Sequence, residues 1–209
     1  MSMRSARRSG ISRKRRWALV GAGGHAKALV EAIDDRGETV EVYVDAKTSG
    51  WLDLPRLATD EELLDRRLRL LIGFGATGPE GLVTRLAKLR SYIDRGFEAP
   101  PLVHRDATVS RGATLGAGTV VLAKAVVQPG AIVGAGVIVN TGAIVEHDAR
   151  IDDGVHVAPG AIVLGGAHIG ECAMIGAGAV VLQFAKVPAG RLVKVNTRWL
   201  KTERTKTTS

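Results

Sequence analysis

The chain has 209 residues, of which 45% are hydrophobic and 4% aromatic, and its formal net charge is +8. This length allows one large or two small domains, and no apolar run approaches the ~18 residues that a membrane-spanning helix needs. No secretory signal is recognisable at the N-terminus, and the one cysteine, Cys172, can form no internal disulfide, so a reducing cytoplasm is the expected location.

The positive charge is concentrated at the two ends of the chain. Seven basic residues and no acidic one precede Trp17, more cations follow Thr197, and the part between them is close to neutral. We expect residues 1–16 to be a disordered basic arm and residues 196–209 a polar basic tail. A start codon at Met3 or an organelle transit peptide would also account for the basic start. Because no aromatic residues or motif accompany the cations, nucleic-acid binding is not expected.

Residues 17–100 are predicted to form a small Rossmann-like α/β domain. Strands are expected at 17–20, 40–44 and 68–72, and helices at 26–33, 60–65 and 79–95, with Asp60 as the N-cap of the short middle helix. An extended segment with Pro100 and Pro101 closes this part of the chain. Strands that alternate with helices are typical of a parallel sheet.

A glycine-rich turn follows the first predicted strand. Gly21-Ala22-Gly23-Gly24-His25-Ala26 matches G-x-G-x-x-A, a loop whose bare backbone approaches a diphosphate at a helix N-terminus. Asp45, at the end of the second strand, is placed to accept a hydrogen bond from a ribose hydroxyl. NAD, a nucleotide sugar or an ordinary tight turn all fit this pattern. A sheet of about four strands favours a single nucleotide diphosphate.

The rest of the chain is a repeat of six residues. Every sixth residue from Val103 is aliphatic without one insertion, as the following list shows: Val103, Val109, Leu115, Val121, Val127, Val133, Val139, Val145, Ile151, Val157, Val163, Ile169, Ile175, Val181, Val187 and Val193. A period of six fits neither a helix nor a single strand, but it fits one short strand plus one corner of a triangular coil. Residues 101–195 are therefore predicted to form a parallel β-helix of about five coils.

One segment of this repeat contains more candidate catalytic residues than the others. Glu146-His147-Asp148 places a histidine between two acids at an outer edge of the prism, and Asn140 and His156 flank the segment. A carboxylate beside an imidazole fixes its tautomer and stabilises the imidazolium, which suits a general base. A surface histidine with incidental acidic neighbours is the alternative, and it is the stronger interpretation for His168.

Together these motifs resemble one family. The chain resembles the sialic acid O-acetyltransferase and bacterial nucleotide-sugar N-acetyltransferase group. The resemblance rests on the glycine turn with its histidine, Asp45, the two prolines, the 140–148 segment, His156 and the 158–161 sequence Ala-Pro-Gly-Ala. The resemblance runs from about Trp17 to Val193. It implies left-handed coiling of the β-helix, a homotrimer with active sites between subunits, and acetyl-CoA and a nucleotide sugar as substrates. A role in bacterial surface glycan synthesis is also implied.

The resemblance also implies roles for single residues. His147 would be the catalytic base and Asp148 its orienting acid. The nucleotide sugar would contact Gly21, Gly23, Gly24, His25, Asp45, Gly73 and Asn140, and acetyl-CoA would contact His156, Gly165 and Ala177.

We expect direct transfer of the acetyl group, because Cys172 has no base at a recognisable spacing and no metal is expected. Three other functions stay open: O-acetylation of sialic acid or a related sugar, a zinc enzyme of the γ-carbonic anhydrase kind, and a non-catalytic scaffold. In the zinc enzyme, His147, His156 and His168 would be the ligands, but their spacings put them on different faces of the coil.

Overall fold

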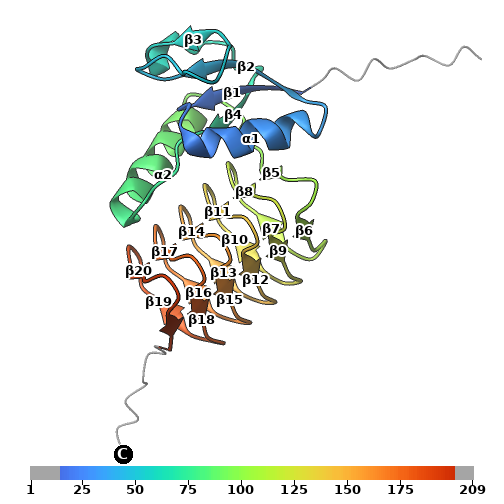
Figure 1. Cartoon of the computed structure of the whole chain (residues 1–209), viewed down its shortest axis with the longest axis vertical. Coiled ribbons are helices and arrows are strands. Elements are labelled where there is room, and N and C mark those ends of the chain that lie inside the picture. The colour runs from blue at the N-terminus through green and yellow to red at the C-terminus, as the bar shows by residue number, and fades with distance from the viewer. Residues whose placement is uncertain (1–14, 201–209) are drawn as a thin grey trace, which may run out of the picture.

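The computed structural model describes residues 15–200 of the chain. Nearly all of the predicted basic arm and most of the predicted basic tail lie outside these residues. No helix within 15–200 is long and apolar enough to cross a membrane. The described part comprises a layered α/β unit resting along one side of a long coil of very short strands (Figure 1).

The N-terminal unit is a four-stranded parallel sheet with two helices. Its strands are β1 (Arg16–Val20), β2 (Thr39–Val44), β3 (Arg56–Leu57) and β4 (Arg69–Ile72), in the order β3-β2-β1-β4. The helices are α1 (Gly24–Asp34) and α2 (Pro79–Asp94). Trp17 and Leu19 of β1 point to one face and Ala18 and Val20 to the other, and both sets are buried, as expected for a central parallel strand.

The prediction of a helix over residues 60–65 is wrong. Only one 3-10 turn, η1 (Asp60–Glu62), forms there, and Leu63 is already extended. Asp60 caps nothing, because its carboxylate accepts hydrogen bonds from Lys88 and from the Tyr92 hydroxyl of α2 instead. These tertiary bonds remove the side chain that the short helix would have needed at its start.

The solenoid consists of two-residue strands. They are β5 (Leu102–Val103), β6 (Thr108–Val109), β7 (Thr114–Leu115), β8 (Val120–Val121), β9 (Val126–Val127), β10 (Ile132–Val133), β11 (Ile138–Val139), β12 (Ile144–Val145), β13 (Arg150–Ile151), β14 (His156–Val157), β15 (Ile162–Val163), β16 (His168–Ile169), β17 (Met174–Ile175), β18 (Val180–Val181), β19 (Lys186–Val187), β20 (Leu192–Val193) and β21 (Arg198–Trp199). Each strand from β5 to β20 ends on the predicted aliphatic residue of its hexad. The inward register was therefore predicted correctly.

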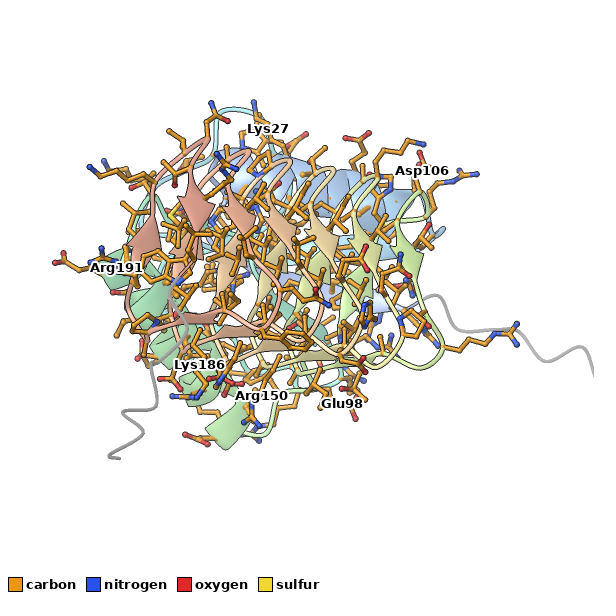
Figure 2. The ribbon with its side chains drawn as sticks, turned by 90° about the horizontal axis from the view of Figure 1, so that it is seen from below. Lys27, Glu98, Asp106, Arg150, Lys186 and Arg191 are labelled. Carbon is orange, nitrogen blue, oxygen red and sulfur yellow. The ribbon has the colours of Figure 1, made fainter. Side chains whose placement is uncertain are left out.

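Three parallel sheets form the sides of the prism, and we name each for its outer face. The junction sheet is β5, β8, β11, β14, β17 and β20; the aliphatic sheet is β6, β9, β12, β15, β18 and β21; the charged sheet is β7, β10, β13, β16 and β19. Arg150 and Lys186 project outward from the charged sheet (Figure 2). The aliphatic sheet carries Val126, Ile144, Ile162 and Val180 on its outer face, all partly buried.

The core of the prism is a stack of aliphatic residues and alanines. Val121, Val139, Val157 and Ile175 are among its fully buried members. The stack continues one hexad beyond the aliphatic series, because Trp199 of β21 packs against it and donates its indole N–H to the Lys186 carbonyl. The fold is thus the predicted combination of a Rossmann-like unit and a left-handed parallel β-helix.

The N-terminal unit covers the junction sheet. Outward residues of that sheet, such as Val120 and Ile138, share one apolar cluster with Trp17 and Leu19 of β1. Helix α2 approaches the adjacent corner closely, since a Cβ added to Gly118 would lie 2.7 Å from the Leu89 side chain. Within one chain, the corner between the aliphatic and charged sheets is therefore the one opposite the N-terminal unit. We call it the distal corner; it comprises residues 146–149, 164–167 and 182–185.

Candidate active site

The glycine turn connects β1 to α1, and two of the predicted glycines have a packing role there. Gly21 has φ +89°, a conformation that favours glycine, and its N–H donates to the Val44 carbonyl at 2.7 Å. Gly73 lies so close to the Gly21 carbonyl and to Leu19 that no Cβ would fit. Both glycines let the turn and the end of β4 come together, which sets the shape of the loop.

Gly23 and Gly24 face open space instead. A Cβ added to either would meet no atom within 4 Å. Gly23 is the N-cap of α1, and no side chain caps this helix. The start of α1 thus has space beside both glycines and N–H groups without a side-chain cap, two features that a phosphate site at a helix N-terminus requires.

Asp45 lies beside this turn, as the sequence predicted, but it is already engaged. Its Oδ2 accepts the Ala22 N–H at 3.0 Å and its Oδ1 accepts the Lys47 N–H at 3.0 Å. Each carboxylate oxygen has a second lone pair, so a ribose hydroxyl can still donate to it. Trp51, which the sequence did not single out, donates its indole N–H to the Ala22 carbonyl at 2.8 Å.

Arg85 occupies the junction between the N-terminal unit and the solenoid, and sequence reasoning missed it. The side chain is almost fully buried on α2. Its guanidinium donates to the carbonyls of Phe74 (3.1 Å), Gly136 (2.9 Å) and Ile72 (3.3 Å). One residue thus ties the loop after β4 to a corner of the coil.

Two histidines lie close to Arg85. Burial, and then the positive charge of Arg85, lower the pKa of His25 to about 3 and the pKa of His156 to about 4. Nε2 of His156 lies 3.0 Å from Nδ2 of Asn140, whose Oδ1 accepts the Thr141 N–H at 2.8 Å. Among the described residues, buried Nε2 of His25 and Nδ1 of His156 have no hydrogen-bond partner. The Ala76 backbone acts to raise the pKa of His156, but it does not outweigh burial. Both rings are neutral at pH 7 and can bind a polar ligand.

His147 is at the distal corner, and its environment is the opposite of the buried one around His25 and His156. The side chain is exposed, and Nδ1 lies 2.9 Å from Oδ2 of Asp148. The hydrogen bond to Asp148 raises the pKa of His147, and the charges of Asp148 and Glu146 act in the same direction. With Nδ1 donating to the carboxylate, Nε2 is the acceptor nitrogen of the ring.

Gly165 supports this imidazole from the next coil. A Cβ added to Gly165 would lie 2.7 Å from both Nε2 and Cε1 of His147. The His147 ring therefore occupies the space that a side chain at position 165 would need. Gly165, which the sequence predicted to contact the coenzyme, thus lies next to the predicted base.

The remaining predicted residues lie elsewhere on the coil. His168 is on the charged sheet, with Nε2 2.8 Å from Oδ2 of Asp152, and Ala177 is at the corner that also holds Asn140. The three histidines proposed as zinc ligands thus occupy three different sides or corners of one chain, as their spacing predicted. Within residues 15–200 no group of three or more His, Cys, Asp or Glu side chains could hold a metal ion.

Cys172 is buried against α2, and burial raises the pKa of its thiol. A buried, protonated thiol is a poor nucleophile. This environment agrees with the expectation that the acetyl group passes directly between substrates.

One chain thus presents two separate groups of candidate residues. The glycine turn, Asp45 and His25 lie on the N-terminal unit, and His156 and Asn140 lie on the solenoid next to it. His147, Asp148 and Gly165 lie at the distal corner. A glycine-rich turn on an α/β unit, joined to a hexapeptide solenoid with an exposed His–Asp pair, is the combination that the sequence led us to expect of a hexapeptide-repeat transferase.

Comparisons with known proteins bear on this class. The family described as "Bacterial transferase hexapeptide (six repeats)" matches residues 148–183. The acetyltransferase domain of PglB from Neisseria gonorrhoeae is 36% identical, with 90% of this chain and 92% of that chain covered and a TM-score of 0.82. Perosamine N-acetyltransferase from Caulobacter crescentus, as a variant with CoA and GDP-perosamine, is 30% identical over 91% of this chain and 90% of that chain, with a TM-score of 0.79. A search of curated proteins gave no match.

The chain belongs to the hexapeptide-repeat sugar acetyltransferases, the family of these two proteins. The resemblance inferred from the sequence is confirmed. It is an enzyme family, so the scaffold interpretation is not needed to explain the fold.

Proposed function

We propose that the protein transfers an acetyl group from acetyl-CoA to an amino group of a nucleotide-activated sugar. The observation that carries this proposal is the exposed His147–Asp148 pair in a chain that also has an open glycine turn. The first supplies a base, and the second supplies a site for the diphosphate of the acceptor.

The relatives support the choice of substrates. A structure of the PglB domain, 37% identical to this chain over 88% of its length, contains acetyl coenzyme A. The perosamine N-acetyltransferase was crystallised with CoA and GDP-perosamine, a nucleotide-linked sugar. We place the present enzyme in the same type of reaction, in the synthesis of bacterial surface glycans and in the cytoplasm.

In the proposed reaction the sugar amine attacks the carbonyl carbon of the thioester. Nε2 of His147 takes the proton of the attacking nitrogen, while Asp148 holds the Nδ1–H and stabilises the imidazolium. The C–N bond forms, the C–S bond breaks, and the coenzyme leaves as the thiol after receiving the proton from His147. Backbone N–H groups at a corner of the coil would hold the negative oxygen of the intermediate.

We propose that the active site forms between subunits of a homotrimer. Within one chain, His147 lies at the corner opposite the sheet that the N-terminal unit covers. A second copy would have to bring its glycine turn to this corner. The aliphatic sheet, with Ile144 and Ile162 on its outer face, offers an apolar surface for that contact.

In this arrangement each part of the chain would bind one of the two substrates. Residues 17–100 would bind the nucleotide sugar through Gly23, Gly24, His25 and Asp45, and residues 101–195 would bind acetyl-CoA. Asn140 and His156, which line the junction, would complete the pocket for the sugar and the thioester. Gly165 would act indirectly, by leaving room for the His147 ring beside it.

The direct test is a thiol-release assay with acetyl-CoA and a panel of UDP-, GDP- and CMP-linked sugars, each with and without a free amino group. Thiol release that requires the amino group, with an acetylated sugar in the mass spectrum, is the expected result. Release with hydroxyl sugars alone would make the protein an O-acetyltransferase. Coenzyme binding without transfer to any sugar would contradict the proposed acceptor.

A further inference from the structure

Phe184 has an unusual backbone conformation. Its φ is +58°, which puts a bulky aromatic residue in the left-handed region. The turn imposes this conformation at the equivalent positions of this corner, which are Gly130, Asp148 and Gly166, and on Lys124, Cys172 and Asn196 at other corners; Phe184 is the one aromatic residue among them. Phe184 is nevertheless 65% exposed, so burial does not compensate for the conformation. A strained residue whose side chain is left in solvent suggests a functional contact.

The Phe184 ring and the predicted base cover neighbouring residues of the distal corner. A Cβ added to Gly166 would lie 2.5 Å from the Phe184 ring, just as one added to Gly165 would meet the His147 ring. The Phe184 N–H also donates to the Gly165 carbonyl at 3.1 Å. The two rings thus rest on consecutive residues, whose Cα atoms are about 3.8 Å apart. This geometry puts the two side chains near each other at the distal corner.

We propose that Phe184 forms an apolar wall beside His147 that binds the pantetheine arm of the acetyl donor. This inference rests on the proposed function and adds a specificity-determining residue to it.

The position of Phe184 favours the donor over the acceptor. An aromatic ring suits the largely apolar arm of coenzyme A better than a nucleotide sugar, which is polar along its length. Phe184 also lies on the C-terminal side of His147 along the solenoid axis. Exposed Lys194 and Arg198 lie further in the same direction, where the phosphates of the coenzyme would meet positive charge.

The test compares Phe184→Asn with the matched variant Lys124→Asn. Lys124 has φ +59° at another corner, and its side chain makes only an exposed ion pair with Asp106. Asparagine tolerates the left-handed region, so both variants should raise the Tm by about 2–4 °C. Only Phe184→Asn should raise the KM for acetyl-CoA and the Kd for CoA, by about tenfold, with the KM for the nucleotide sugar unchanged. Phe184→Leu, which keeps an apolar side chain, should recover part of this loss.

Different outcomes separate this inference from the proposed function. If wild-type protein binds CoA and transfers acetyl but Phe184→Asn has wild-type constants, Phe184 does not contact the donor. A variant that sediments as a smaller species would show that Phe184 packs against another subunit and would also overturn the inference. Wild-type protein that neither binds CoA nor transfers acetyl would instead contradict the proposed function itself.

Discussion

The distal corner and the domain junction contain the same kind of side chain in opposite surroundings. His147 is exposed next to Asp148, which raises its pKa, whereas His25 and His156 are buried next to Arg85, and their pKa values are lowered. A histidine that is to accept a proton needs a partner for the charged form. A histidine kept neutral by burial can only donate or accept a hydrogen bond. These surroundings support the proposal that proton transfer takes place at the corner and substrate binding at the junction.

Replacing the base should give the largest effect. His147→Ala should lower turnover by about 10²-fold or more, with CoA binding nearly unchanged, because the variant loses proton transfer and keeps the binding surface. The measurement is steady-state kinetics together with calorimetric titration of CoA. His168→Ala is the matched control, since His168 also pairs with an aspartate, 2.8 Å away, but on the charged sheet. Equal losses in both variants would remove His147 from the mechanism.

Replacing the buried arginine at the junction should lower the stability of the fold. Arg85→Met leaves the carbonyls of Ile72, Phe74 and Gly136 without their donor, and each buried unsatisfied group costs about 1–3 kcal/mol. We expect the free energy of unfolding to fall by about 3 kcal/mol or more in urea titrations. Arg90→Met removes only exposed ion pairs with Asp153 and Glu171 and should cost less than about 1 kcal/mol. Similar losses in both variants would contradict a special role for the buried guanidinium.

The support under the base can be tested by adding one methyl group. Gly165→Ala places a Cβ against the His147 ring and should displace it, which we expect to lower kcat by about tenfold while the fold is kept. Gly50→Ala is the control, because a Cβ there meets no atom within 4 Å. Kinetics and circular dichroism measure the two effects. A Gly165→Ala enzyme with wild-type kcat would show that the ring position is not critical.

The smallest expected change is a shift in pH dependence. The base must be neutral to act, so activity should fall as the pH drops through the pKa of His147, which Asp148 holds above its ordinary value. In Asp148→Asn this pKa falls, and the acid limb of kcat/KM should move to lower pH. The profile should be recorded with an acceptor amine whose own titration is known. An unmoved acid limb would assign it to another group.

The sequence predicted the inside of the solenoid better than its surroundings. Each inward position is dictated by a local six-residue rule, so the strands from β5 to β20 end where the pattern places them. Asp60 was misassigned because its partners, Lys88 and Tyr92, belong to another helix. Local capping rules cannot foresee such a tertiary contact.

Arg85 was missed for a related reason. Its partner Gly136 lies 51 residues away, so the bond itself has no local signal. One clue was present, because Arg85 is three residues after Leu82 and four before Leu89, on the buried face of α2. A charged residue at such a position indicates a buried hydrogen-bond network. The glycine turn and the His147–Asp148 pair were predicted because each is contiguous in sequence.

The central claim, that the base and the phosphate-binding turn of one active site come from different subunits, has a direct test. His147→Ala lacks the base, and Gly23→Asp places a carboxylate where the diphosphate should bind, at an N-cap position that suits aspartate and has free space. Each variant alone should be nearly inactive. When the two are co-expressed in equal amounts, random mixing should restore about one quarter of wild-type activity, because that share of intersubunit sites receives two intact halves. Mixed assemblies without any recovered activity would contradict the claim and place both halves of the site within one chain.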